Sequence, residues 1–462
     1  MALEGAYIVP HPPLIVPEIG RGEQLKISKT IDAYNEVANQ ISIIKPDTII
    51  VISPHSTSYS DYIHIASGEE ASGSFIRFGA PSVKMHVKYD QDLIKMISLK
   101  ANHELISAGT LGEQNESLDH GVMVPLYFIN QKYHDYKLVR ISISNLSSLV
   151  HYRLGKCIAQ AIKESNKKVI IVASGDLSHK LREDGPYGLS PDGPIFDHEV
   201  TSAMSKGDFL QFLSFDADFC ESAAECGLRS FIITAGALDG KAVKSKLLSY
   251  EGPFGVGYGV ASFYITGDDN TRCFDTIFEQ LEQKRLDAIK IKEDKYVRLA
   301  RQSVEHYVKT HKYLHRPNNL DGELINQRAG VFVSLKKDGI LRGCIGTINA
   351  CTDCIADEII NNGVSACSFD PRFEPVTEDE LDSLVYSVDV LGSAESIQSI
   401  NELDTKRYGV IVRASRNRCG LLLPNLEGID TPSQQVSIAL RKGNIEQNEK
   451  YTLERFEVVR HK

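Results

Sequence analysis

Three histidines in the first 180 residues share one local context, and imidazole is both a common metal ligand and a proton carrier near neutral pH. Each follows an apolar run that predicts a strand: His11 in Val-Pro-His-Pro-Pro, His55 in Ile-Ser-Pro-His-Ser, and His179 in Ser-Gly-Asp-Leu-Ser-His. In open α/β sheets the carboxyl ends of the strands form the crevice where ligands bind. We therefore expect the three imidazoles to converge there.

Glu225 is the carboxylate that best completes such a site. It stands in Ser-Ala-Ala-Glu-Cys-Gly-Leu-Arg, at the start of an apolar helix predicted over 222–238, where an unpaired buried carboxylate is costly. Two imidazoles and one carboxylate form the facial triad of non-haem iron(II), which leaves coordination positions open. One histidine after a strand is more often a surface or hydrogen-bonded residue, and Glu225 alone suits a helix N-terminus. Because three histidines share this context, we weigh a metal site equally with these simpler roles.

The elements that would position these residues alternate along the first part of the chain. Short β-branched runs predict strands over 6–9, 48–53, 138–142, 169–173 and 256–264, and amphipathic stretches predict helices that include 25–44, 149–164 and 222–238. This order predicts an α/β domain with a mostly parallel or mixed sheet flanked by helices.

The polar segment 268–289 has no strand-like run and predicts a linker between two domains, 1–267 and 290–462. The second part opens with an amphipathic helix over 296–308 and continues through short strands, which predicts a separate α+β domain. A chain of 462 residues is long enough for two cores.

The composition narrows the classes of function. The net charge is −10 and no basic run is interleaved with aromatic residues, so we expect no nucleic-acid partner. The longest apolar runs are far shorter than the roughly 20 residues that span a bilayer, so we expect no membrane span. Nine cysteines without a disulfide-module pattern indicate a reducing, cytoplasmic setting. A homodimer is the default expectation for a soluble enzyme of this size.

Three further signals favour structural roles. The glycine-rich segment 252–259 precedes a strand, whereas a dinucleotide loop must follow one, so a turn or bulge is favoured. Cys351 and Cys354 have the spacing of half a zinc site, but no second pair follows. Cys344 has no paired histidine in its segment, which favours packing in a tight, close-approach turn over a role as nucleophile.

These motifs together resemble the catalytic subunit of class III extradiol dioxygenases, the LigB type, over roughly residues 3–266. The segments that carry the resemblance are His11 with its two prolines, Ser-Pro-His55, Asp-His120-Gly-Val-Met-Val-Pro-Leu, Gly-Asp-Leu-Ser-His179 and Glu225. The resemblance implies that His11, His55 and Glu225 hold iron(II), that His179 is the acid/base, and that His120 contacts substrate. Memo proteins share this fold with altered ligands.

The second part, about 290–462, resembles the AMME-syndrome candidate (AMMECR) family. Leu-Arg-Gly-Cys344-Ile-Gly-Thr, Asp370-Pro-Arg-Phe and Gly420-Leu-Leu-Leu-Pro carry this resemblance. The fusion of both parts resembles the protein A family of the AmmeMemoRadiSam system, which implies radical SAM and Memo proteins of that system as partners.

The resemblance implies an Fe(II)-dependent dioxygenase that cleaves the ring of a small catecholic or related aromatic substrate with O2. Iron would lower the pKa of a bound phenol, and His179 would take and return the proton. Two alternatives stay open. Two histidines and one glutamate also serve catalytic zinc in hydrolases. A Memo-like protein could instead bind metal, act in redox chemistry or bind a partner without dioxygenase activity.

Overall fold

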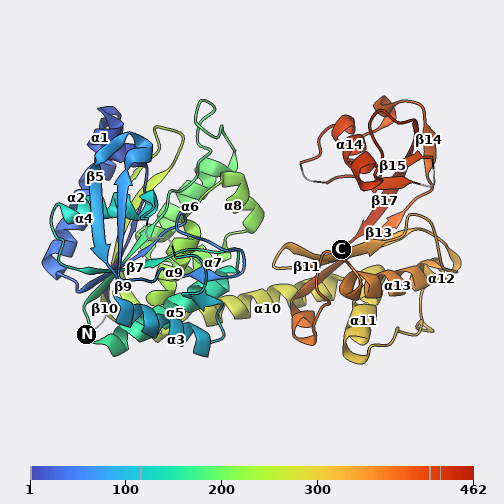
Figure 1. Ribbon diagram of the computed structural model, residues 1–462. Coiled ribbons are helices and arrows are strands. Elements are labelled where there is room, and N and C mark those ends of the chain that lie inside the picture. Colours follow the sequence, from blue (N-terminus) through green and yellow to red (C-terminus); the bar gives the residue numbers. More distant parts are fainter. Residues whose placement is uncertain (1–2, 115–116, 416–417, 427) are drawn as a thin grey trace. The chain divides into compact units, whose positions relative to one another are not determined.

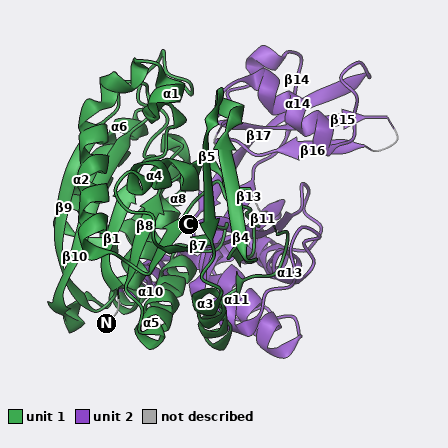
Figure 2. Ribbon diagram, turned by 60° about the vertical axis from the view of Figure 1, so that its left-hand side comes forward, with its two compact units in different colours: residues 1–280 green, residues 281–462 purple. Residues whose placement is uncertain are grey.

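The computed structural model describes residues 3–114, 117–415, 418–426 and 428–462, and the chain divides into two compact units, 1–280 and 281–462 (Figures 1 and 2). Each unit has its own hydrophobic core. The buried cluster of unit 1 ranges from Leu3 to Phe274, and the clusters of unit 2 range from Tyr296 to Phe456. No helix within the described ranges is both long and apolar enough to cross a membrane.

A six-stranded mixed sheet with the order β7-β2-β8-β1-β10-β9 forms the centre of unit 1. The first four strands are parallel, and β10 and β9 are antiparallel. β2 and β8 are buried along their whole length, as expected for parallel strands covered on both faces. This confirms the predicted mixed sheet. The six strands are β1 (Leu3–Val9), β2 (Thr48–Ile52), β7 (Lys137–Ile141), β8 (Val169–Ser174), β9 (Lys241–Glu251) and β10 (Tyr258–Asp268).

Helices flank this sheet (Figure 2). Two short two-stranded sheets, β3-β6 and β4-β5, lie in the connections between β2 and β7. The helices are α1 (Pro17–Gly20), α2 (Ser28–Ile44), α3 (Gln91–His103), α4 (His120–Asn130), α5 (Ser148–Ser165), α6 (Asp192–Lys206), α7 (Phe209–Ser214), α8 (Ala217–Ala223) and α9 (Leu228–Ala237). A further helix, α10 (Phe274–Lys292), begins in unit 1 and continues beyond its last residue, 280. The small strands are β3 (Ile63–His64), β4 (Glu70–Phe75), β5 (Ala80–Lys88) and β6 (Ala108–Gly109). α10 occupies most of the segment expected to be a linker.

The single helix expected over 222–238 is wrong, because the chain breaks between α8 and α9. Ala224 has a left-handed backbone with φ 52°, and α9 begins only at Leu228. The loop that follows is pressed against the loop after β8: a Cβ added to Gly175 would lie 2.1 Å from Gly227 Cα. Glycine at both positions permits this crossing, which brings the loop 224–227 to the end of β8.

Unit 2 is an α+β unit with one antiparallel sheet, which confirms the predicted class. The strand order is β12-β11-β13-β17-β15-β16, and β14 also pairs with β17. The strands are β11 (Val331–Lys337), β12 (Ile340–Gly346), β13 (Leu384–Leu391), β14 (Glu395–Ile397), β15 (Tyr408–Ala414), β16 (Cys419–Leu422) and β17 (Tyr451–His461). The helices are α11 (Lys295–Thr310), α12 (Gly322–Asn326), α13 (Ile355–Ser368) and α14 (Pro432–Lys442).

The expectation of a tight turn at Cys344 is wrong, because Cys344 lies within β12. The close approach itself is present one residue earlier, where a Cβ on Gly343 would lie 2.2 Å from the carbonyl oxygen of Ala366. The glycine that precedes the cysteine therefore lets α13 pack onto the strand. The glycine-rich segment 252–259 does form the predicted turn, between β9 and β10.

Candidate metal centre

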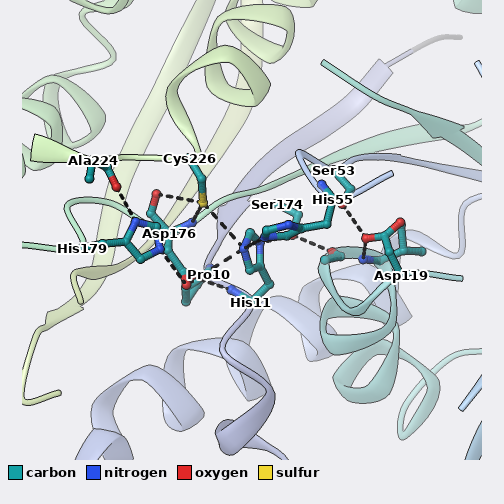
Figure 3. A network of polar contacts seen from close by, with 12 residues as sticks. Pro10, His11, Ser53, His55, Asp119, Ser174, Asp176, His179, Ala224 and Cys226 are labelled. Atoms are coloured by element: carbon teal, nitrogen blue, oxygen red, sulfur yellow. Dashed lines mark hydrogen bonds and ion pairs between the residues drawn. The ribbon is translucent and has the colours of Figure 1, made fainter. Parts of the chain in front are cut away.

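Two of the three strand-end histidines meet at one edge of the sheet in unit 1. β1, β8 and β2 are adjacent and parallel, so their carboxyl ends share that edge. His11 and His55 follow β1 and β2, and their Nε2 atoms are 3.0 Å apart with the ring planes at 78° (Figure 3). His11 is only 2% exposed, whereas His55 is exposed. The pair is therefore anchored in the core on one side and open to solvent on the other.

The tautomer of His11 follows from its neighbours. His11 Nδ1 lies 2.9 Å from Ser174 Oγ, and Ser174 Oγ lies 2.5 Å from the carbonyl oxygen of Gly121. A carbonyl only accepts, so the serine hydroxyl donates to Gly121 and accepts from the Nδ1–H of His11. His11 Nε2 then carries a lone pair directed toward His55. A ligating histidine is held in the same way by a hydrogen bond to its second nitrogen.

Cys226 supplies the third donor. Its Sγ lies 3.6 Å from His11 Nε2 and accepts a hydrogen bond of 3.3 Å from the backbone N–H of Asp176. Donor atoms of His11, His55 and Cys226 all lie within 4.8 Å of one another. Burial raises the pKa of the Cys226 thiol well above its ordinary value, and the carboxylates of Asp176 and Glu225 add to this effect. Burial also lowers the pKa of His11, so the cluster holds neutral groups that a cation would complement.

Glu225 lies in the loop that precedes α9, and its carboxylate is not one of the three clustered donor groups. Its Oε2 accepts a hydrogen bond of 2.7 Å from the backbone N–H of Leu228. A carboxylate in this position is stabilised by the free N–H groups of the helix. Burial raises the pKa of Glu225, and the Leu228 N–H opposes that shift. The structure thus brings His11 and His55 together with Cys226 and holds Glu225 at a helix terminus.

His120, the first residue of α4, borders the histidine pair. Its ring centroid is 4.1 Å from that of His55 and 5.3 Å from that of His11. Burial lowers the pKa of His120 to about 4, and His55 adds to the effect. Asp119 fixes this arrangement: it caps α4 through the Val122 N–H at 3.1 Å and accepts from Ser53 Oγ at 2.6 Å, just before His55.

His179 lies on the other side of the cluster. Its Nδ1 hydrogen-bonds to the carbonyl oxygen of Ala224, which can only accept, so Nδ1 carries the proton and Nε2 is free. That Nε2 is 4.0 Å from Asp176 Oδ2, which in turn is 3.9 Å from His11 Nε2 (Figure 3). His179 can therefore act as a proton acceptor at the edge of the site.

Asp176 connects the two flanks of the site. Its Oδ1 accepts a hydrogen bond of 2.8 Å from the backbone N–H of His11. Burial raises the pKa of Asp176 to about 7, while that hydrogen bond opposes the shift. Neither Asp176 nor Cys226 was predicted as a site residue from the sequence. The available signals were the aspartate within the Gly-Asp-Leu-Ser-His motif and the thiol directly after Glu225.

The fold and the site define a class, an α/β scaffold with a cluster of side chains at its strand ends that could hold a metal ion, followed by an α+β unit. Residues 5–261, more than half of the chain, match the family model described as the catalytic LigB subunit of aromatic ring-opening dioxygenase. Residues 297–461 match AMMECR1. The chain belongs to the LigB family and carries an AMMECR1 domain after the LigB domain, as its motifs indicated.

Several other proteins are similar in sequence to this chain. "Protein CA_C1420" of Clostridium acetobutylicum is 45% identical over 470 residues, covering 100% of both chains. A protein of Thermotoga maritima is 45% identical over 174 residues, which cover 37% of this chain and 99% of the relative. The crystal structure of the uncharacterized protein PH0010 from Pyrococcus horikoshii is 29% identical, covers 36% of this chain and 88% of its own, and has a TM-score of 0.34.

Proposed function

We propose that unit 1 is a metal-dependent oxidoreductase whose ion is held by His11, His55 and Cys226. The observation that carries this proposal is the clustering of the three donors within 4.8 Å at the strand ends. The 3.0 Å between the two Nε2 atoms suits imidazoles that share one ion, since metal–imidazole bonds are about 2.0–2.1 Å for zinc. Iron(II) is the ion that we expect from the family, and zinc is the alternative.

The residues around the cluster would handle protons and substrate. A bound ion supplies Lewis acidity, which makes a coordinated hydroxyl group easier to deprotonate. His179 presents a free Nε2 beside Asp176 and would accept that proton, because its Nδ1–H is already committed to Ala224. His120 lies against the ring of His55 and would contact a substrate that enters from the exposed side. Buried His11 is the anchor of the site.

Ring cleavage of a catecholic substrate with O2 is the second candidate, and the LigB match over residues 5–261 favours it. By resemblance, that chemistry uses a carboxylate from Glu225 as the third ligand. In this chain Glu225 bonds to the N–H of Leu228, and a thiol lies where the third ligand is needed. A thiol suits softer metal chemistry, so the geometry favours a Memo-like redox or metal-binding role over ring cleavage.

Metal analysis after anaerobic purification from iron-supplemented cells tests the proposal. We expect near-stoichiometric iron in the wild type and in Glu225→Gln, and loss of the metal in His11→Ala and Cys226→Ala. Cys273→Ala is the matched control, since Cys273 is a partly buried thiol directly before α10. Retention of metal by Cys226→Ala with loss in Glu225→Gln would overturn the thiol ligand and restore the carboxylate triad.

Oxygen uptake separates the two candidates in the same preparations. The redox or metal-binding role predicts no ring-cleaved product from a panel of catechols. Oxygen uptake matched by a ring-cleaved product would establish the second candidate. Zinc in place of iron, insensitive to oxygen, would support the hydrolase alternative.

A further inference from the structure

Two aromatic side chains lie next to the two histidines that flank the metal centre. The ring centroid of Phe78 is 5.5 Å from that of His120, and the ring centroid of Tyr187 is 5.3 Å from that of His179. Both pairs meet edge to face, with the ring planes at 63° and 72°. His120 and His179 lie on opposite sides of the donor cluster, so one aromatic ring adjoins each flank of the site.

Phe78 is held by the turn between β4 and β5. It is the last residue of a short 3₁₀ turn, Ile76–Phe78, which ends at Gly79 with φ 80°. A left-handed backbone of this kind favours glycine, so the turn has a defined end. The ring centroid of Phe78 lies 6.1 Å from that of Phe75, which is fully buried. Phe75 therefore anchors a side chain that stays 38% exposed beside His120.

Tyr187 is held by the loop between β8 and α6. This loop closes on itself where Leu181 and Leu189 form an antiparallel bridge. It is also fastened to the turn between β9 and β10, since Arg182 Nη1 donates to the carbonyl oxygen of Pro253 at 2.9 Å. Tyr187 is 63% exposed although the loop that carries it is fixed at these points. Its ring therefore stays in solvent at a defined place beside the site.

Exposed apolar side chains around a cluster of polar groups are typical of ligand sites. We propose that Phe78 and Tyr187 determine the specificity of the metal centre. They favour ligands in which a flat apolar group is attached directly to the coordinating atoms, over aliphatic ligands with the same coordinating atoms. The flat group packs against the two rings and removes them from water, whereas a small aliphatic group leaves them exposed. This inference rests on the metal centre proposed for unit 1.

A pair of hydroxamates tests the specificity of the full-length protein loaded with Co(II). Benzohydroxamate and acetohydroxamate coordinate through the same two oxygen atoms, and they differ in a phenyl ring in place of a methyl group. Titrations followed by the visible absorption of Co(II) give a dissociation constant for each compound. The ratio of their affinities for Co(II) in free solution is the reference, because it accounts for the intrinsic difference between the two sets of oxygen donors.

We expect the wild type to prefer benzohydroxamate several-fold more strongly than free Co(II) does. Phe78→Ala and Tyr187→Ala should each lower this preference, and Tyr187→Phe should keep it because the ring remains. Ile43→Ala is the control, since Ile43 is an exposed apolar residue near the end of α2, which leads to the opposite edge of the sheet. All four variants should take up Co(II) like the wild type, because the side chains that change are exposed and do not coordinate.

The two ways in which this experiment can fail are distinguishable. A wild type that does not bind Co(II) would refute the metal centre proposed for unit 1, and with it the role of the two rings. If the wild type binds Co(II), a preference equal to that of free Co(II), or one unchanged by both alanine substitutions, would overturn the role of Phe78 and Tyr187 alone.

Discussion

At the scale of single residues, Ser174 decides how His11 can bind a metal. The Ser174 hydroxyl donates a hydrogen bond to the carbonyl oxygen of Gly121, so it accepts one from the Nδ1–H of His11. The Nε2 atom of His11 is therefore left unprotonated. We expect Ser174→Ala to weaken metal affinity by about 10–100-fold, since partners of this kind orient the ligand and raise its basicity. Competition with a chromophoric chelator measures the affinity.

The control for this substitution is Ser205→Ala, which removes a serine hydroxyl from the exposed surface of α6. That variant should bind metal like the wild type. An affinity unchanged in Ser174→Ala would show that His11 does not need this hydrogen bond, and the assigned tautomer would be wrong.

Glu380 gives unit 2 a predictable response to acid. Burial alone would raise its pKa, but Arg342, the N–H of Thr377 and Lys337 outweigh burial and lower it to about 2. A depressed carboxyl pKa stabilises the fold above the unfolded value, and this stability is lost as pH falls from about 4.5 to about 2. We expect Glu380→Gln to lose roughly 1–3 kcal/mol at pH 7 and to flatten that acid dependence.

Urea unfolding of the full chain at several pH values measures this effect in the transition of unit 2. Glu378→Gln is the matched control, because Glu378 is an exposed glutamate two residues earlier. If Glu380→Gln kept the acid dependence of the wild type, the ion pair with Arg342 would not be the cause.

The limit of prediction from sequence is visible at Glu225 and Cys226. Both residue types can ligate iron, they are adjacent, and the choice depends on a backbone turn. Ala224 adopts a left-handed backbone with φ 52° although it is not a glycine. The residue type at this position therefore does not predict the turn. The apolar pattern on either side favoured one continuous helix, which made the carboxylate the natural candidate. Only the close crossing of Gly175 and Gly227 shows why the helix must break.

At the scale of elements, the crossing of two loops positions the thiol. We expect Gly175→Ala to destabilise unit 1 by roughly 1–3 kcal/mol and to reduce metal binding, because the new methyl group would meet the backbone of Gly227. Thermal unfolding and metal content measure the two effects. Gly267→Ala is the control, since nothing lies within 4 Å of a Cβ at that position. Normal metal content in Gly175→Ala would contradict this account of the loop.

The elements that sequence reasoning found are those with a strong pattern. β2 and β8 read as uninterrupted apolar runs because they are covered on both faces. β9 was not predicted, because its lysines alternate with apolar residues along a sheet edge that is only partly covered. The hairpin β4-β5 is similarly exposed and weakly patterned. Neither β9 nor the β4-β5 hairpin therefore has a local hydrophobic pattern that predicts a strand.

At the scale of the whole molecule, two units with separate cores should unfold in separate steps. An ion bound by unit 1 stabilises only the folded form of that unit. We therefore expect two transitions in calorimetry, of which added iron(II) under anaerobic conditions raises only one. A metal-induced shift of both transitions would show that the units unfold as one body.

The central claim is that a thiol from Cys226 completes the metal centre of unit 1. The absorption spectrum of the protein loaded with Co(II) tests this directly, because a thiolate ligand gives a strong charge-transfer band in the near ultraviolet. We expect that band in the wild type and in Glu225→Gln, and its loss in Cys226→Ser. A wild type that binds one equivalent of cobalt without the band, or a spectrum that responds to Glu225→Gln but not to Cys226→Ser, would contradict the claim.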